Sequence, residues 1–190
     1  MRDEDQAVRA ELAADGSLFD GYHPRMEEVH RRNASRLAKV LDQHGWPGKS
    51  LVGEDGADAA WMIAQHAIGE PEFQRRCLTL LKEAAANNEL PLWQPACLED
   101  RIRMFEGKPQ LYGTQYDWDE NGEMSPLPIE NPDQVDERRA VLGLIPLAEN
   151  TKQMREGVSK EKEPQPRDWA ARQQEFEVWA HKVGWRDQET

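Results

Sequence analysis

Residues 55–68, with the sequence DGADAAWMIAQHAI, predict the most apolar helix of the chain and place it at the centre of the fold. Small or apolar side chains occupy several sides of this segment, which is typical of a helix that is buried all round. They are Ala59, Ala60, Trp61, Ile63, Ala64 and Ala67. We therefore expect the other helices to pack around this segment.

Helical patterns flank this segment on both sides. Residues 24–44 carry apolar side chains at a helical period, and Gly45 supplies a natural end for that helix. Pro71 is a favoured first-turn proline and starts the helix that follows. The helices predicted from these and similar patterns span residues 1–15, 24–44, 71 to 87 or 88, and 95–105.

The pattern changes after the last of these helices. Strand-forming residues on both sides of a turn at residues 119–122 predict a β-hairpin over residues 110–129. Pro126 and Pro128 confine its second arm to a sheet edge, because proline has no backbone N–H to donate. Two further helices are predicted over residues 132–142 and 146–156.

The chain is thus predicted to be mostly α: a compact multi-helix domain with one small β-hairpin and an appended C-terminal helix. We expect a core domain over residues 1–157, a polar linker over 158–167 and a docking helix over 168–190. The last helix carries an apolar stripe that should pack on the core domain or on a partner chain. The stripe consists of Trp169, Phe176, Trp179 and Val183.

The composition limits the classes of partner. A net charge of −12 would be repelled by nucleic acid or by an anionic membrane surface, so we expect neither as a partner. No apolar run approaches the length of about 20 residues that a membrane span needs, and the N-terminus lacks the apolar core of a secretory signal. Cys77 and Cys97 fit buried thiols in a reducing compartment, although a disulfide or a metal site is an alternative. We expect a soluble cytoplasmic protein.

Gln65 and His66 stand out because they lie in the most apolar helix. An amide and an imidazole in such a place need hydrogen-bonding partners, since unpaired burial is unfavourable. One interpretation is a pair that moves a proton or orients a substrate, with Trp61 one turn away on the floor of a pocket. The alternative is a core histidine whose ring is satisfied by a backbone carbonyl.

Asp100 and Arg101 lie in the middle of the helix predicted over 95–105. An inward-facing Arg101 would offer a planar fork to a carboxylate, sulfate or phosphate group of a ligand. The alternative is an internal salt bridge with Asp100 or with a glutamate.

The segment Tyr112-Gly113-Thr114-Gln115 places three hydrogen-bonding side chains on or beside a predicted strand. Alternation along a strand would bring the hydroxyl groups of Tyr112 and Thr114 to one face. Gly113 would allow another group to approach the backbone closely, and is equally consistent with a bulge.

His30 and Asn33 lie one turn apart on the first long helix and can face one cavity. Asp42, near the end of that helix, is a candidate to assist proton transfer, although a capping or surface role fits it better. A metal site formed by His30 and His66 lacks a compelling third ligand in the sequence, so we expect no metal and no cofactor. No serine lies in a Gly-x-Ser-x-Gly setting, which argues against covalent catalysis.

Short motifs from residue 45 to residue 139 resemble an uncharacterised, mainly actinobacterial family that is filed as a domain of unknown function. The upstream helix with His30 and Asn33 also resembles the start of that family. Cys97, where the family tends toward an aromatic residue, and the tail after residue 158 depart from its pattern. The resemblance implies no activity. The motifs that carry it include Gly45-Trp46-Pro47, Gln65-His66, Asp100-Arg101-Ile102, Gln110-Leu111-Tyr112-Gly113-Thr114-Gln115 and Arg138-Arg139.

The first functional hypothesis is a cofactor-independent enzyme that acts on a small, polar, anionic metabolite. Elimination, hydrolysis and an intramolecular displacement that expels sulfate or phosphate are all compatible with it, and a tailoring step in natural-product biosynthesis would be a suitable setting. The catalytic candidates are His66, Tyr112, His30 and Asp42. The substrate-binding candidates are Gln65, Arg101, Thr114, Gln115, Asn33 and Trp61.

The second hypothesis is a non-catalytic binding protein or subunit. In that case the polar residues are structural, and the tryptophan-bearing C-terminal helix docks a partner in a homo- or hetero-oligomer. The stripe of Trp169, Phe176 and Trp179 would form the interface.

Overall fold

The computed structural model describes residues 1–19, 21–161 and 168–186 of the chain. The chain divides into two compact units, one over residues 1–98 and one over residues 99–190. The division falls inside a helix, α5 (Trp93–Phe105). It differs from the expected partition at residue 158, and the single core domain over 1–157 stays a prediction.

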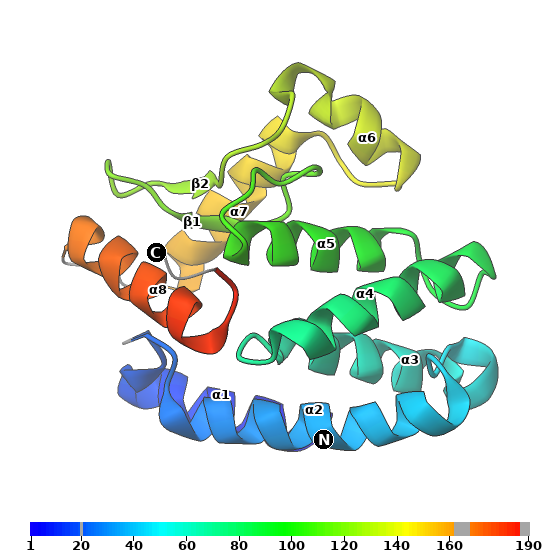
Figure 1. The fold of residues 1–190 in the computed structure, drawn as a ribbon. Helices are drawn as coiled ribbons and strands as arrows, with labels where there is room; N and C mark the ends of the chain where they lie inside the picture. The colour runs from blue at the N-terminus through cyan, green and yellow to red at the C-terminus, as the bar shows by residue number, and fades with distance from the viewer. Residues whose placement is uncertain (20, 162–167, 187–190) are drawn as a thin grey trace. The chain divides into compact units, whose positions relative to one another are not determined.

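The first unit is a helical assembly built around α3 (Lys49–His66), the segment expected at its centre. Three helices pack most extensively against it, and Figure 1 shows it between α2 and α4. The three are α1 (Arg2–Asp15), α2 (Pro24–His44) and α4 (Pro71–Ala86). Between α1 and α2 lies the short 3-10 helix η1 (Ser17–Phe19). Helices over α1, α2, α3 and α4 were predicted from the sequence, whereas η1 was not.

The start of α3 differs from the prediction. Gly53 has a φ of 73° inside this helix, where a short first turn from Lys49 meets the main helical segment. That first turn is held by Glu89, whose carboxylate accepts hydrogen bonds from the backbone N–H and the hydroxyl of Ser50. Since Gly53 breaks the helical pattern and Glu89 is distant in sequence, the periodicity alone placed the start at residue 55.

The second unit contains the hairpin, but the hairpin is shorter than predicted. Its strands are β1 (Tyr116–Trp118) and β2 (Met124–Pro126), antiparallel with Tyr116 opposite Pro126. The expected range of 110–129 was too long. Residues 111–115 form a loop, because their backbone N–H groups bond to side chains instead of to a neighbouring strand.

Three helices and a 3-10 turn follow the hairpin, in agreement with the predicted order. They are η2 (Pro132–Gln134), α6 (Val135–Val141), α7 (Leu147–Glu161) and α8 (Trp169–Val183). Residues 158–161 belong to α7, so this part of the expected linker is helical. The remainder of that linker, residues 162–167, lies outside the described residues.

The C-terminal helix α8 packs on its own unit. The indole N–H of Trp169 donates to the backbone oxygen of Trp118 at 2.9 Å, and the guanidinium of Arg172 pairs with Asp117 at 2.9 Å. Phe105 stacks on Trp185, with ring centroids 5.1 Å apart. The fold class is therefore confirmed: a mostly helical chain with one two-stranded antiparallel hairpin and a C-terminal helix.

None of the described helices combines the length and the apolar character that crossing a lipid bilayer requires. Both cysteines are free thiols. Cys77 is fully buried, and burial raises the pKa of its thiol to about 12, although the nearby Arg76 acts in the opposite direction.

Candidate functional site

The most unusual side chain of the first unit is a buried carboxylate, Asp5 of α1, which is only 1% exposed. It lies on the inward stripe of that helix, three and seven residues before Val8 and Leu12. An ionised carboxylate withdrawn from water is unfavourable unless charged or hydrogen-bonding groups replace its hydration. Its partners therefore define the site.

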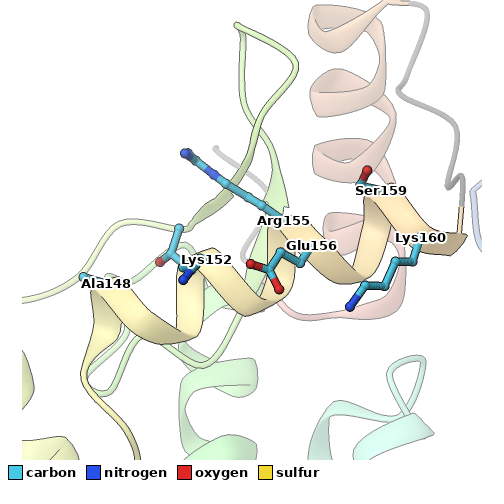
Figure 2. A pocket seen from close by; sticks show the side chains of 7 residues that line it. Ala148, Lys152, Arg155, Glu156, Ser159 and Lys160 are labelled. Atoms are coloured by element: carbon cyan, nitrogen blue, oxygen red, sulfur yellow. The ribbon is translucent and has the colours of Figure 1, made fainter.

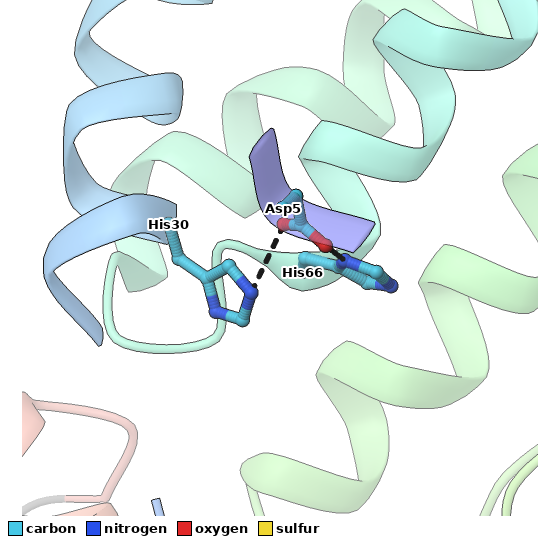
Figure 3. Close-up of side chains that lie close together, drawn as sticks. All are labelled: Asp5, His30 and His66. Atoms are coloured by element: carbon cyan, nitrogen blue, oxygen red, sulfur yellow. Dashed lines mark hydrogen bonds and ion pairs between the residues drawn. The ribbon is translucent and has the colours of Figure 1, made fainter. Parts of the chain in front are cut away.

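Two imidazoles flank the carboxylate of Asp5, as Figure 3 shows. Oδ1 lies 2.9 Å from Nδ1 of His66, at the C-terminal end of α3. Oδ2 lies 3.1 Å from Nε2 of His30, on the first half of α2. The two ring centroids are 5.3 Å apart. We call these three residues the Asp5–His30–His66 cluster.

Tyr22 extends the cluster beyond His30. Its hydroxyl lies 2.9 Å from Nδ1 of His30, and the two rings stack with centroids 5.7 Å apart. Burial raises the pKa of the Tyr22 phenol, and the negative charges of Glu27, Glu70 and Asp5 raise it further. Tyr22 is therefore a neutral phenol that can either donate to or accept from His30.

The two imidazoles determine the charge state of Asp5. Burial by itself would raise the pKa of this carboxyl group, but the contacts with His30 and His66 outweigh burial and hold the pKa well below its usual range. Asp5 is accordingly an anion at neutral pH. The two histidines differ in access to solvent, since the side chain of His30 is 10% exposed and that of His66 is 28% exposed.

A family model matches residues 1–160, which is most of the chain and includes the whole cluster. The chain belongs to DUF6624, a family of unknown function. The resemblance drawn from the sequence motifs is thus confirmed at the level of the family. No curated protein and no solved structure matches this DUF6624 chain.

Of the site residues predicted in the first unit, the structure brings His30 and His66 together. Asn33 instead donates from its amide to the backbone oxygen of Met1 at 3.3 Å, which holds the start of α1 over α2. Asp42 pairs with Arg76 at 2.7 Å on the surface, outside the cluster. This position supports the surface alternative for Asp42.

Gln65 and Trp61 serve packing contacts around α3. The backbone oxygen of Gln65 accepts a hydrogen bond from the amide of Gln74 at 3.1 Å, and the Gln65 side chain is buried. Trp61 donates from its indole N–H to the backbone oxygen of Gln94 at 3.1 Å and meets Trp93 edge to face. The structure places neither of them as a partner of Asp5.

The candidates in the second unit gather around the loop that precedes β1. The carboxylate of Asp100, fully buried in α5, accepts the backbone N–H groups of Leu111, Tyr112 and Thr114. Its Oδ2 also accepts the Thr114 hydroxyl at 3.0 Å. Tyr112 and Thr114 are therefore loop residues, and the expectation that strand alternation aligns their hydroxyls was wrong.

Two arginines complete this loop. Arg139 of α6 is 2% exposed, and its guanidinium donates to the backbone oxygens of Tyr112 at 2.7 Å and Gly113 at 3.2 Å. Arg101 donates from Nε to the side-chain oxygen of Gln115 at 3.1 Å. Arg101 of α5 thus lies beside the loop that carries Tyr112, Thr114 and Gln115, whose conformation is set by Asp100 and Arg139, while their expected site with His66 stays a prediction.

A surface hollow lies beside α7. Its lining comes from this one helix and consists of Ala148, Thr151, Lys152, Arg155, Glu156, Ser159 and Lys160, most of which Figure 2 labels. These residues are mostly exposed, and Arg155 is engaged by Glu123 and by the backbone oxygen of Met124. A hollow lined by solvated side chains of one helix offers no convergent chemistry, so we place the candidate site at the cluster.

Proposed function

We propose that this DUF6624 protein is an enzyme that acts on a small, polar, anionic metabolite by proton transfer at the Asp5–His30–His66 cluster, without an organic cofactor. The observation that carries the proposal is the 2.9 Å contact between Asp5 Oδ1 and His66 Nδ1. A buried carboxylate beside one ring nitrogen of a partly exposed histidine is the arrangement in which histidine acts as a general base.

The roles follow from the protonation states. Because Asp5 is ionised, it accepts the Nδ1–H of His66, and this leaves the lone pair of His66 on Nε2. Nε2 then takes a proton from the reacting group, and Asp5 stabilises the imidazolium that forms. General-base catalysis of this kind contributes roughly 10²–10⁴-fold to a rate.

Three reaction classes fit this chemistry. In hydrolysis His66 removes a proton from the attacking water. In elimination it removes a proton from the carbon next to the leaving group, which departs with its bonding electrons. In an intramolecular displacement it removes a proton from the nucleophilic nitrogen or oxygen of the substrate, while sulfate or phosphate leaves. The last of these suits a tailoring step in natural-product biosynthesis.

A separate anion-binding role is assigned to Arg101 within the second unit, with Tyr112, Thr114 and Gln115 as the other candidate residues of its loop, and this role is not part of the Asp5–His30–His66 cluster. A guanidinium on a loop with hydroxyl and amide groups suits sulfate, phosphate or carboxylate. The hydrogen bond of Arg101 to Gln115 supports this assignment, since it holds the two side chains together.

The experiment is a release assay for sulfate and phosphate over a panel of small sulfate and phosphate monoesters. We expect His66→Ala to lower turnover of an accepted substrate at least about 100-fold while circular dichroism stays that of the wild type. His44→Ala is the matched control, because His44 is an exposed histidine outside the cluster. Unchanged turnover by His66→Ala would show that the site is wrongly assigned.

The alternative, a non-catalytic subunit that docks a partner through α8, has less support. The indole of Trp169 and the ring of Phe176 are engaged within their own unit, by Trp118 and Phe105. Among the described residues of this helix, the large apolar side chains that stay exposed are Val178, at 64%, and Trp169, at 39%. Light scattering on the wild type and on Val178→Asp tests this alternative, since loss of an oligomer in the variant would favour it.

A further inference from the structure

Two atoms at the centre of the cluster do not form the hydrogen bond that their distance would allow. Asp5 Oδ2 and His30 Nε2 are 3.1 Å apart and buried, yet neither has a hydrogen-bond partner among the described residues. Their contact is short but badly aligned for an N–H···O bond. Buried polar atoms without partners are rare in proteins and call for an explanation, such as an ion that both atoms bind.

We propose that Asp5, His30 and His66 form a binding site for one divalent transition-metal ion of the Zn²⁺ class. Each residue offers a ligand atom, and the three atoms lie within 4.8 Å of one another. Two imidazole nitrogens and a carboxylate oxygen are ligands that suit Zn²⁺ and its neighbours better than Mg²⁺ or Ca²⁺. The sequence offered no third ligand for His30 and His66, and Asp5 supplies it.

The distances within the cluster agree with ligands of one ion. Zn²⁺ binds nitrogen and oxygen at about 2.0–2.2 Å, so neighbouring ligand atoms on a tetrahedral ion stand about 3.3–3.6 Å apart. The observed separations are 2.9 Å between Asp5 Oδ1 and His66 Nδ1 and 3.1 Å between Asp5 Oδ2 and His30 Nε2, a few tenths of an ångström below that spacing. Two atoms that bind the same ion do not need to be aligned as a hydrogen bond. This accounts for the poor alignment of Asp5 Oδ2 and His30 Nε2.

Tyr22 provides the outer support that a metal-bound histidine normally has. When Nε2 of His30 gives its lone pair to an ion, Nδ1 carries the proton and donates it to another group. The Tyr22 hydroxyl oxygen is 2.9 Å from that Nδ1 and can accept its hydrogen bond.

Figure 3 shows His30 and His66 approaching the carboxylate of Asp5 from separate helices. The partly exposed His66 marks the side from which an ion enters, and three protein ligands leave a position for water.

This inference uses the same side chains as the proposed function, but metal binding can be measured without any catalytic turnover. A bound ion coordinates the lone pair of His66 Nδ1, and it also coordinates the Asp5 carboxylate that otherwise orients the His66 ring. The general-base form of His66 is then lost, so we expect Zn²⁺ to inhibit the proposed reaction.

The test is titration calorimetry of the full-length, chelator-treated protein with ZnCl2, with CoCl2 as a spectroscopic probe and MgCl2 as a hard-cation control. We expect one Zn²⁺ per chain, a visible Co²⁺ spectrum of low-coordinate type, and no Mg²⁺ binding. His30→Gln and Asp5→Asn should each weaken Zn²⁺ binding at least about 100-fold, and Tyr22→Phe roughly 10–100-fold. His44→Gln, a change of an exposed histidine, should bind as the wild type does.

Stoichiometric binding that His30→Gln leaves intact, or no binding at all, would overturn the metal site. Turnover measured with and without Zn²⁺ distinguishes failure of this inference from failure of the proposed function. If Zn²⁺ does not bind and His66→Ala is inactive, the metal site is wrong and the proton-transfer role stands. If Zn²⁺ binds and raises turnover, the metal site stands and the general-base role of His66 is wrong.

Discussion

Asp5 shows how one polar residue organises a helical unit. Its carboxylate has exchanged water for two imidazoles, and through them it ties α1 to the first half of α2 and to the C-terminal end of α3. A signal for it exists in the sequence, because Asp5, Val8 and Leu12 lie on one stripe of a short helix. A charged residue on an inward stripe is a strong indication of a buried partner, but it does not say which residue the partner is.

The stability of the chain should depend on the ionisation of Asp5. Because the folded-state pKa of Asp5 is lowered, its contribution is present above the unfolded pKa of about 3.9 and is lost as the pH falls through the folded value. We expect the stability difference between the wild type and Asp5→Asn to be largest near neutral pH and to shrink below about pH 4. Urea unfolding of both proteins in EDTA at several pH values measures this. A difference that is the same at pH 3 and pH 7 would contradict the prediction.

Asp100 plays the corresponding part in the second unit. Its carboxylate satisfies the backbone N–H groups of Leu111, Tyr112 and Thr114. Burial raises the pKa of Asp100, and these hydrogen bonds act in the opposite direction.

Asp100→Ala should therefore destabilise the protein by about 3 kcal/mol or more, because it leaves several buried donors without an acceptor. Thermal unfolding followed by circular dichroism checks this value. Asp133→Ala, which removes the same charge from an exposed position, is the control and should change stability by less than about 0.5 kcal/mol. Equal melting temperatures for the two variants would show that Asp100 does not hold the loop.

At the scale of elements, local signals account for most helix boundaries. Pro24 and Gly45 bracket α2, and Pro71 begins α4, as the sequence predicted. The errors fall where a side chain distant in sequence replaces a local signal. Glu89 holds the unexpected first turn of α3, and Asp100 holds the loop that was expected to be a strand.

Two glycines in helices should respond to alanine with opposite signs. Gly53 has a φ of 73° and a ψ of 171°, a backbone region essentially restricted to glycine that costs an L-residue about 1–3 kcal/mol, so Gly53→Ala should be destabilising. Gly157 lies within α7 with open space at its Cβ position, so Gly157→Ala should stabilise by about 0.5–1 kcal/mol. Urea unfolding of both variants measures the two changes. The same sign for both would contradict the backbone described for α3.

At the scale of the whole molecule, each unit has its own cluster of buried polar groups. The first holds Asp5 with His30 and His66, and the second holds Asp100 and Arg139 around the loop before β1. The family match extends over both, and it ends before α8. Because the net charge is −12, binding of any anion would need a local cationic group, and Arg101 is one such group within the second unit.

The sequence alone predicted the features that depend on residues close together along the chain. Helical periodicity, prolines at first turns and glycines at ends act over a few residues, so they revealed the helices and singled out His30, His66 and Arg101. It missed Asp5, Tyr22 and Arg139 as members of the sites. Asp5 and His66 are 61 positions apart, and no local rule relates residues at that separation.

Tertiary packing decided which of these residues meet. The stripe of α1 buries Asp5 against α2 and α3, and only that docking brings its carboxylate between two imidazoles. The same packing gave Asn33 and Trp61 structural partners and left Asp42 on the surface. The physical reason is that a helix is held by hydrogen bonds between residues close together in the sequence, so local patterns predict it. A site forms only where several helices pack together and bury side chains that are far apart along the chain.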